Sequence, residues 1–196
     1  IKGGDIFLAL KGKRFHGNKF ISEAINKGAR FCITDKKNFK ENKKIIYVKN
    51  IYNYLSEIAK RKRDLYKGKV IGITGSAGKT TLKEWLKETL KNNFLVYSNP
   101  GNFNNLIGMP ITLVNIPKNT EICILELGMN TYGEIKELAR IARPDIAIIT
   151  NIGNAHLEGL KNIDGVADEK SDIFVFIGLN VLSNSKVPLL SSLSHI

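Results

Sequence analysis

The apolar positions of this chain follow two spacings, and each spacing predicts one kind of secondary structure. Short apolar runs rich in β-branched residues, typical of buried strands, cover residues 5–10, 30–34, 45–48, 69–74, 94–98, 122–127 and 146–150. Apolar residues three or four positions apart predict helices over residues 19–26, 51–66, 80–91, 106–114 and 132–142. Strands that alternate with helices in this way predict an α/β fold with parallel sheets.

The same pattern predicts two domains. Lys67 and Gly68 end the helix over 51–66, so we expect a small N-terminal α/β domain over 1–67 and a larger parallel-sheet domain over 68–196. The helix before the boundary has an apolar face and a basic face. The buried face is predicted to hold Ile51, Leu55, Ile58 and Leu65, and the polar face Lys60, Arg61, Lys62 and Arg63.

Residues 69–81 read KVIGITGSAGKTT, an apolar strand followed by glycines and a helix start. Gly72, Gly75 and Gly78 allow a tight turn with inward N–H groups, and the positive end of the following helix attracts phosphate. Lys79 is predicted to bridge the outer phosphates of ATP, and Thr80 to hold Mg²⁺. The predicted nucleotide-binding residues are Gly75, Ser76, Ala77, Gly78, Lys79, Thr80 and Thr81. The larger domain is therefore predicted to be a P-loop-type ATPase domain.

This glycine-rich segment departs from the standard phosphate loop at one position. The standard pattern has a glycine five positions before Gly78, where this chain has Ile73, and Gly72 lies one place too early. A glycine-rich turn followed by a chance Lys-Thr pair is the alternative. The helical spacing that follows favours the phosphate site. The apolar residues with this spacing are Leu82, Trp85, Leu86 and Leu90.

Polar loops follow directly after the strands of the larger domain, and the carboxyl ends of parallel strands meet at one ligand-binding edge. Glu126 ends an apolar strand and is predicted to bind Mg²⁺ or orient water, the alternative being a Glu paired with a lysine. Asn102, Asn104 and Asn105 suit contacts to sugar or phosphate, although Asn is also a common loop residue. His156 lies in the last of these loops, as either a functional or a structural histidine.

Composition and charge indicate a globular protein and argue against nucleic-acid binding and membrane insertion. The 196 residues are 43% hydrophobic, which is ordinary for a globular protein with a core. The net charge of +12 is spread over scattered lysines without interleaved aromatic residues, so we expect solvated faces and no nucleic-acid partner. Cys32 and Cys123 lie in apolar runs and are predicted to be core residues. Without a long apolar run or a signal-like start, the sequence predicts a cytoplasmic protein that does not insert into membranes.

Several motifs together resemble the ATP-dependent Mur ligases of peptidoglycan synthesis. They are TGSAGKTT at 74–81, GNFNNLIGMP at 101–110, ELGMN at 126–130 with GEI at 133–135, AHLEG at 155–159 and GVADEKSDIF at 165–174. The opening segment GDIFLALKG at 4–12 is similar to that family's nucleotide-sugar domain. The resemblance covers about residues 3–174.

The resemblance implies a ligase that uses ATP and Mg²⁺ to convert a carboxylate into an acyl phosphate, which an amine then attacks. It implies UDP-N-acetylmuramoyl-tripeptide and D-alanyl-D-alanine as substrates and a monomeric protein. It implies Lys79, Glu126, His156 and Lys170 as catalytic residues, and Thr80, Glu126, His156 and Lys170 as metal ligands. Lys170 would be carbamylated, because an ammonium would repel Mg²⁺. Spacing alone predicts an exposed helical lysine at that position.

Other functions remain open from the sequence. Another Mur ligase or a folylpolyglutamate synthase would share the phosphate loop and the lysine. The family's adenine-binding and amine-binding segments fall outside this chain, and the resemblance is lost after Phe174, so a non-catalytic nucleotide-binding fragment is a second alternative. An unrelated P-loop kinase or GTPase would carry a strand-borne Asp as its metal anchor, where this chain has Glu126.

Overall fold

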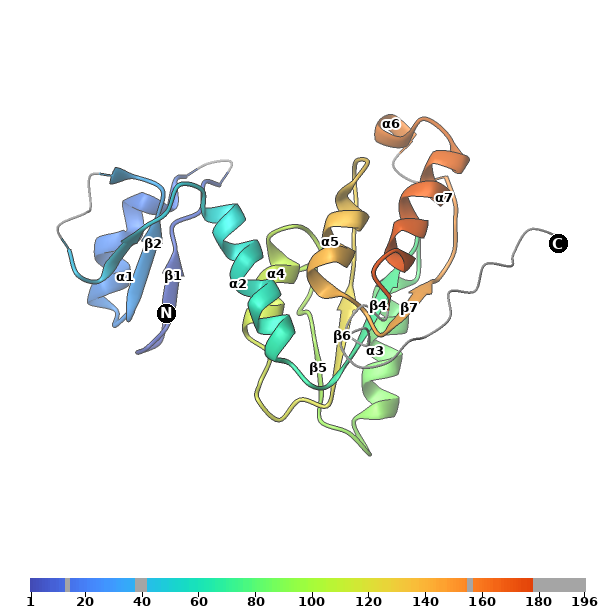
Figure 1. Cartoon of the computed structure of the whole chain (residues 1–196), viewed down its shortest axis with the longest axis horizontal. Helices are drawn as coiled ribbons and strands as arrows, with labels where there is room; N and C mark the ends of the chain where they lie inside the picture. Colours follow the sequence, from blue (N-terminus) through green and yellow to red (C-terminus); the bar gives the residue numbers. More distant parts are fainter. Residues whose placement is uncertain (13–14, 38–41, 155–156, 178–196) are drawn as a thin grey trace. The chain divides into compact units, whose positions relative to one another are not determined.

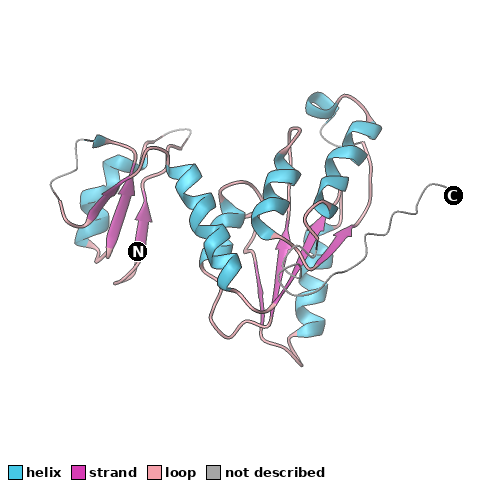
Figure 2. Cartoon of the chain, viewed as in Figure 1, coloured by secondary structure: helices cyan, strands magenta, loops and turns pink. Residues whose placement is uncertain are grey.

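The structure is a computed structural model that describes residues 1–12, 15–37, 42–154 and 157–177. The chain forms two compact units, Ile1–Ile58 and Ala59 onward, and each unit has its own parallel sheet (Figure 2). The division lies inside helix α2 (Ile51–Leu65), several residues before the boundary at Lys67 and Gly68 that the sequence predicts. The α/β class and the parallel strands are confirmed.

The N-terminal unit is a three-stranded parallel sheet with the order β1-β2-β3. Its elements are β1 (Ile6–Leu8), the 3₁₀ helix η1 (Gly17–Phe20), α1 (Ile21–Asn26), β2 (Phe31–Thr34) and β3 (Ile45–Tyr47). The start of the helix predicted over 19–26 is therefore a separate 3₁₀ turn. The core combines residues of strands, helices and the segments between them: Ala9, Ile21, Ala24, Ala29, Cys32 and Ile51.

The second unit is built on a four-stranded parallel sheet with the order β5-β6-β4-β7 (Figure 1). Its strands are β4 (Lys69–Thr74), β5 (Val96–Ser98), β6 (Ile122–Glu126) and β7 (Ile146–Ile149). Its helices are α3 (Lys79–Leu90), α4 (Gly108–Val114), α5 (Glu134–Ala142), α6 (Leu157–Leu160), α7 (Ile163–Ser171) and the 3₁₀ helix η3 (Asp172–Phe174). Because all four strands run the same way, the loops that follow them meet at one edge.

Helices cover both faces of the second sheet. On one face, Cys123 and Leu125 of β6 pack with Leu113 of α4, Leu138 of α5 and Val166 of α7. On the other face, α3 packs over the sheet. The residues in that contact are Leu82, Leu86, Leu90, Ile71, Ile73 and Ile124. The buried, unpaired cysteines Cys32 and Cys123 are core residues, as the sequence predicts. Within the described residues, no helix is long and apolar enough to cross a membrane.

At the end of α2, the buried and exposed sides of the helix are the reverse of those predicted. Leu65 is 76% exposed, whereas Arg63, predicted to be solvated, is 3% exposed. The Arg63 guanidinium donates to the backbone oxygens of Ala142 at 2.7 Å and Arg143 at 2.9 Å, and to the Asp145 carboxylate at 2.9 Å. Arg63 therefore satisfies the last carbonyls of α5, and this pairing offsets the cost of burying its charge.

In helix α3, two residues also differ in burial from what the apolar pattern of the sequence predicts. Trp85 has the spacing of a buried residue but is 69% exposed, because the contact with the sheet is made by the neighbouring leucines. Lys83, on the same helix, is fully buried. Its contacts belong to the candidate site.

Candidate functional site

The turn after β4 requires glycine at two positions. Gly75 has a φ of +150°, and a Cβ there would lie 1.9 Å from the Thr150 hydroxyl oxygen. Gly78 has a φ of +77° and is the N-cap of α3, and no described side chain caps this helix. The first N–H groups of a helix lack intrahelical partners, and their partial positive charge favours an anion. Gly72, by contrast, was wrongly predicted to shape the turn, because it lies inside β4.

The segment after β7 braces the turn. The Thr150 hydroxyl donates to Ala77 O at 2.5 Å, and the Asn151 side-chain oxygen accepts from Ala77 N at 2.9 Å. Ser76 N donates to Asn151 O at 3.1 Å. Because Asn151 occupies the N–H groups of Ser76 and Ala77, the helix start over 78–81 is the part of the turn that offers open donors.

Lysine, hydroxyl and carboxylate groups meet at this edge of the sheet. Lys79 Nζ donates to Gly75 O at 2.6 Å, so the ammonium lies over the turn. Thr80 Oγ1 donates to Glu126 Oε2 at 2.7 Å, which joins the start of α3 to the end of β6. These three side chains were predicted as a phosphate and metal site from separate segments of the sequence.

Glu126 is 2% exposed, and three side chains contact its carboxylate. Its Oε1 accepts from Asn104 Nδ2 at 2.8 Å, and its Oε2 lies 3.8 Å from Lys83 Nζ. The lysine partner that the sequence left open as an alternative is therefore present. It is Lys83, one helical turn after Lys79, and that spacing is the signal in the sequence that could have identified it.

Asn99 is a site residue that sequence reasoning missed. It follows β5 directly and is fully buried. Its Nδ2 donates to Phe103 O at 2.9 Å and to Glu126 O at 3.1 Å, and its Oδ1 accepts from Glu126 N at 2.9 Å. Asn99 thus fixes the backbone on both sides of Glu126 and the loop over 99–105. Its place directly after a strand was the available signal.

The other candidate residues have different surroundings. Asn102 is exposed, and the Asn105 side-chain oxygen accepts from Ile107 N at 3.0 Å and Gly108 N at 2.9 Å at the start of α4. Asn104 holds Glu126, as described above. The substrate contacts predicted for these asparagines remain predictions, and His156 lies outside the described residues.

Lys170 is 1% exposed, so the spacing-based prediction of an exposed lysine was wrong. The neighbouring Glu169 accepts from Gly133 N at 2.7 Å and Ile135 N at 2.8 Å and so binds α7 to the start of α5. This packing buries Lys170. Burial, together with the nearby positive charge of Lys79, lowers the pKa of Lys170 to about 8, and Glu169 opposes the shift.

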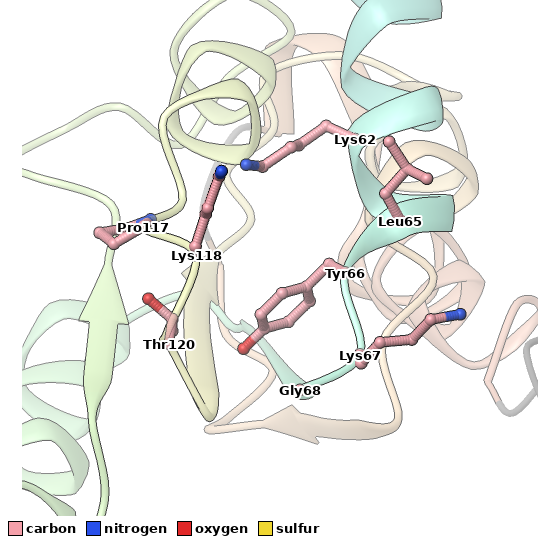
Figure 3. A pocket seen from close by; sticks show the side chains of 8 residues that line it. All are labelled: Lys62, Leu65, Tyr66, Lys67, Gly68, Pro117, Lys118 and Thr120. Carbon is pink, nitrogen blue, oxygen red and sulfur yellow. The ribbon is translucent and has the colours of Figure 1, made fainter.

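A pocket of about 300 Å³ opens at the opposite end of the second sheet, where α2 ends and β4 begins (Figure 3). Lys62 and Lys118 point toward each other in its lining, which also includes Tyr66 (Figure 3). The pocket adjoins Gly68, at the start of β4, whereas Lys79 follows the end of that strand. Six strand residues span about 20 Å, so the pocket is not part of the candidate site.

Comparisons with known proteins identify the family of this chain. Residues 73–187 match the model of the Mur ligase middle domain, and residues 1–88 match the model described as Mur ligase family, catalytic domain. UDP-N-acetylmuramoyl-tripeptide–D-alanyl-D-alanine ligases are among the relatives. That of Rickettsia prowazekii is 45% identical over 89% of this chain and 39% of its own length. That of Bacillus subtilis is 41% identical over 86% of this chain and 37% of its own length.

Solved structures show the same fold. MurF from Acinetobacter baumannii superposes with a TM-score of 0.82 at 34% identity, over 90% of this chain and 39% of that chain. MurF ligase from Thermotoga maritima in complex with ADP superposes with a TM-score of 0.83 at 38% identity, over 91% of this chain and 42% of that chain. The chain thus spans about two fifths of the length of these proteins. It belongs to the Mur ligase family.

Proposed function

We propose that this chain is part of an ATP-dependent ligase that joins D-alanyl-D-alanine to UDP-N-acetylmuramoyl-tripeptide in peptidoglycan precursor synthesis. The observation that carries the proposal is the 2.7 Å bond from Thr80 Oγ1 to Glu126 Oε2 beside Lys79. It unites the glycine-rich turn with a strand-end carboxylate in a protein whose relatives are ligases of this name. The Thermotoga maritima relative is a complex with ADP, which supports ATP as the nucleotide.

The proposed reaction has two steps. The γ-phosphoryl group of ATP passes to a carboxylate oxygen of the tripeptide, and ADP leaves. The amine of D-alanyl-D-alanine then attacks the acyl carbon, loses a proton and displaces phosphate. Lys79 and the N–H groups at the start of α3 would bind the phosphates and stabilise the charge that develops on them.

The residues present fit Mg²⁺. Thr80 and Glu126 supply oxygen ligands, which Mg²⁺ prefers, and the ion commonly takes one or two carboxylates together with substrate phosphates. Among the described residues, no group of three or more His, Cys, Asp and Glu could hold a metal alone, so the phosphates would complete the site. When bound, Mg²⁺ would neutralise phosphate charge. His156 stays a predicted ligand.

We propose that Lys170 is carbamylated. A carbamate would replace a buried ammonium near Lys79 with an anion that could bind Mg²⁺. Carbon dioxide reacts with the neutral amine, and a pKa of about 8 leaves about half of the Lys170 amines neutral at pH 8, against less than about 1% for an ordinary lysine. At a fixed bicarbonate concentration the neutral amine fraction, and with it the amount of carbamate at equilibrium, rises as the pH increases through 8.

Isotope-labelled bicarbonate is therefore expected to produce a carbamate signal in the NMR spectrum that grows between pH 7 and pH 9. The Lys170→Met variant is the control and is expected to lack that signal. A protein that binds nucleotide and Mg²⁺ but keeps an unmodified Lys170 amine would contradict the carbamate.

For the N-terminal unit we propose binding of the nucleotide sugar, on the basis of the resemblance of GDIFLALKG at 4–12 to the family's nucleotide-sugar domain. The unit is small and has a separate core, as expected for a substrate module. Absence of a nucleic-acid partner, a monomeric state and a cytoplasmic location remain predictions from the sequence.

The proposed function is tested on a protein that joins this chain to the segments that complete its relatives' length. Phosphate release is expected to need ATP, UDP-N-acetylmuramoyl-tripeptide and D-alanyl-D-alanine together. Glu126→Gln is expected to reduce the rate by a factor of about 100, because a neutral amide is a weak ligand for Mg²⁺. Glu88→Gln, on the exposed side of α3, is the matched control and should be as active as wild type.

Two results would contradict this function. Release with a free amino acid in place of D-alanyl-D-alanine would indicate another Mur ligase or a folylpolyglutamate synthase. Nucleotide binding by the completed protein without phosphate release would contradict the ligase and favour the non-catalytic, nucleotide-binding alternative.

A further inference from the structure

Lys83 is a fully buried charged residue that the proposed chemistry does not use. Its side chain is 0% exposed, and burial of an ammonium is costly unless it is paired and hydrogen-bonded. Most lysines of the chain are solvated, so this one requires a local reason. Its contacts supply that reason.

Four oxygen atoms surround the Lys83 ammonium, two as hydrogen-bond acceptors and two as ion-pair partners. Nζ donates to Asn99 O at 3.0 Å and Gly101 O at 3.4 Å, and it lies 3.4 Å from Glu84 Oε1 and 3.8 Å from Glu126 Oε2. The side chain is also fully buried, so a phosphate or substrate has no direct access to it. Any effect of Lys83 on the reaction therefore passes through these partners.

The loop that Lys83 contacts is hydrogen-bonded to Glu126, the candidate metal ligand, at two residues. Asn99, whose carbonyl accepts from Lys83, bonds with its side chain to both N and O of Glu126. The loop that begins at Asn99 also carries Asn104, whose amide donates to Glu126 Oε1 at 2.8 Å. Gly128 N donates to Asn104 O at 2.8 Å, so the loop is bound to the segment after β6 as well.

We propose that Lys83 is a positioning residue that holds the loop over 99–105 against Glu126 and thereby keeps the carboxylate in place for Mg²⁺. The proposal rests on the proposed function of the nucleotide edge. The proposed phosphate-binding groups of that edge are Lys79 and the N–H groups at the start of α3, and in the described part of the chain Lys79 donates to Gly75 O and not to this loop. Loss of Lys83 therefore affects metal-assisted nucleotide binding and leaves metal-free nucleotide binding nearly unchanged.

The test compares Lys83→Met with Lys87→Met in this chain. Methionine has a similar length but neither charge nor donors, and Lys87 is a half-exposed lysine on the same helix. Hydrogen exchange measures the exchange rates of the backbone amides in the loop. Calorimetry measures ADP affinity with and without Mg²⁺, and thermal unfolding measures the stability of the fold.

For Lys83→Met we expect faster exchange over 101–105 and at Gly128. Mg²⁺ is expected to increase the ADP affinity of this variant by a factor about tenfold smaller than in wild type. Without Mg²⁺, the ADP affinity should stay within about threefold of wild type. Lys87→Met should match wild type in all three measurements. A purely structural residue would not separate metal-assisted from metal-free binding.

Several outcomes would overturn the proposal. Unchanged loop exchange would mean that Lys83 does not hold the loop, and an unchanged or larger Mg²⁺ gain would mean that Lys83 does not position Glu126. An equal loss of affinity with and without Mg²⁺ would indicate general destabilisation. If Lys83→Met does not fold, Lys83→Gln retains donors without charge and takes its place. If neither variant folds, Lys83 serves stability and the proposal is wrong.

Failure of the nucleotide proposal is distinguishable from failure of the Lys83 proposal. A wild-type chain that binds no ADP would contradict nucleotide binding by this chain. Loop exchange needs no ligand, so in that case it alone decides the role of Lys83: faster exchange in Lys83→Met supports it and unchanged exchange overturns it.

Discussion

Lys79→Met is expected to weaken ADP binding about 100-fold. The ammonium lies over the glycine-rich turn and would make charge-assisted bonds to the phosphates, each contributing about 1.5–3 kcal/mol. A loss of about 2.7 kcal/mol corresponds to that factor in Kd. Titration calorimetry of the wild type and the variant at equal ionic strength measures the change, because salt screens such contacts.

The control for Lys79→Met is again Lys87→Met, which removes the same charge farther along α3. Thermal unfolding of Lys79→Met should match wild type, because the bond it loses joins Lys79 to Gly75 within one turn. If the variant retained ADP affinity within threefold of wild type, the segment would be a glycine-rich turn without a phosphate role.

Arg63→Met is expected to be the most destabilising substitution in the second unit. It removes the donors that satisfy Ala142 O and Arg143 O, and it leaves Asp145 with Val70 N at 2.8 Å and with Lys69, whose side chain is 68% exposed. Breaking a buried ion pair by removing one partner costs about 3–5 kcal/mol. We expect the melting temperature to fall by roughly 10 °C.

Arg61→Met is the matched control for Arg63→Met. Arg61 lies on the same helix but is exposed, and surface substitutions usually change stability by less than about 0.5 kcal/mol. Urea denaturation gives the free energy of unfolding of both variants. Equal stability of the two would show that the buried guanidinium contributes no more than a solvated one.

Sequence reasoning succeeded where several local patterns indicated the same structure. The strand, glycine turn and helix over 69–90 were predicted because strand pattern, glycine placement and helical spacing agree there. The parallel order of strands then brought Lys79, Thr80 and Glu126 to one edge, since every strand ends there. Lys170 was predicted to be a site residue only from the family motifs, because its spacing alone predicted a solvated side chain.

The sequence by itself determined which segments form strands and helices and which polar loops share the ligand edge, because these depend on patterns within a few residues. The tertiary structure alone decided which charged side chains are buried. In the sequence, the buried residues Arg63, Lys83 and Lys170 resemble solvated lysines and arginines. Their burial depends on carbonyls and carboxylates that come from distant segments, and only the folded chain brings those partners within hydrogen-bonding distance.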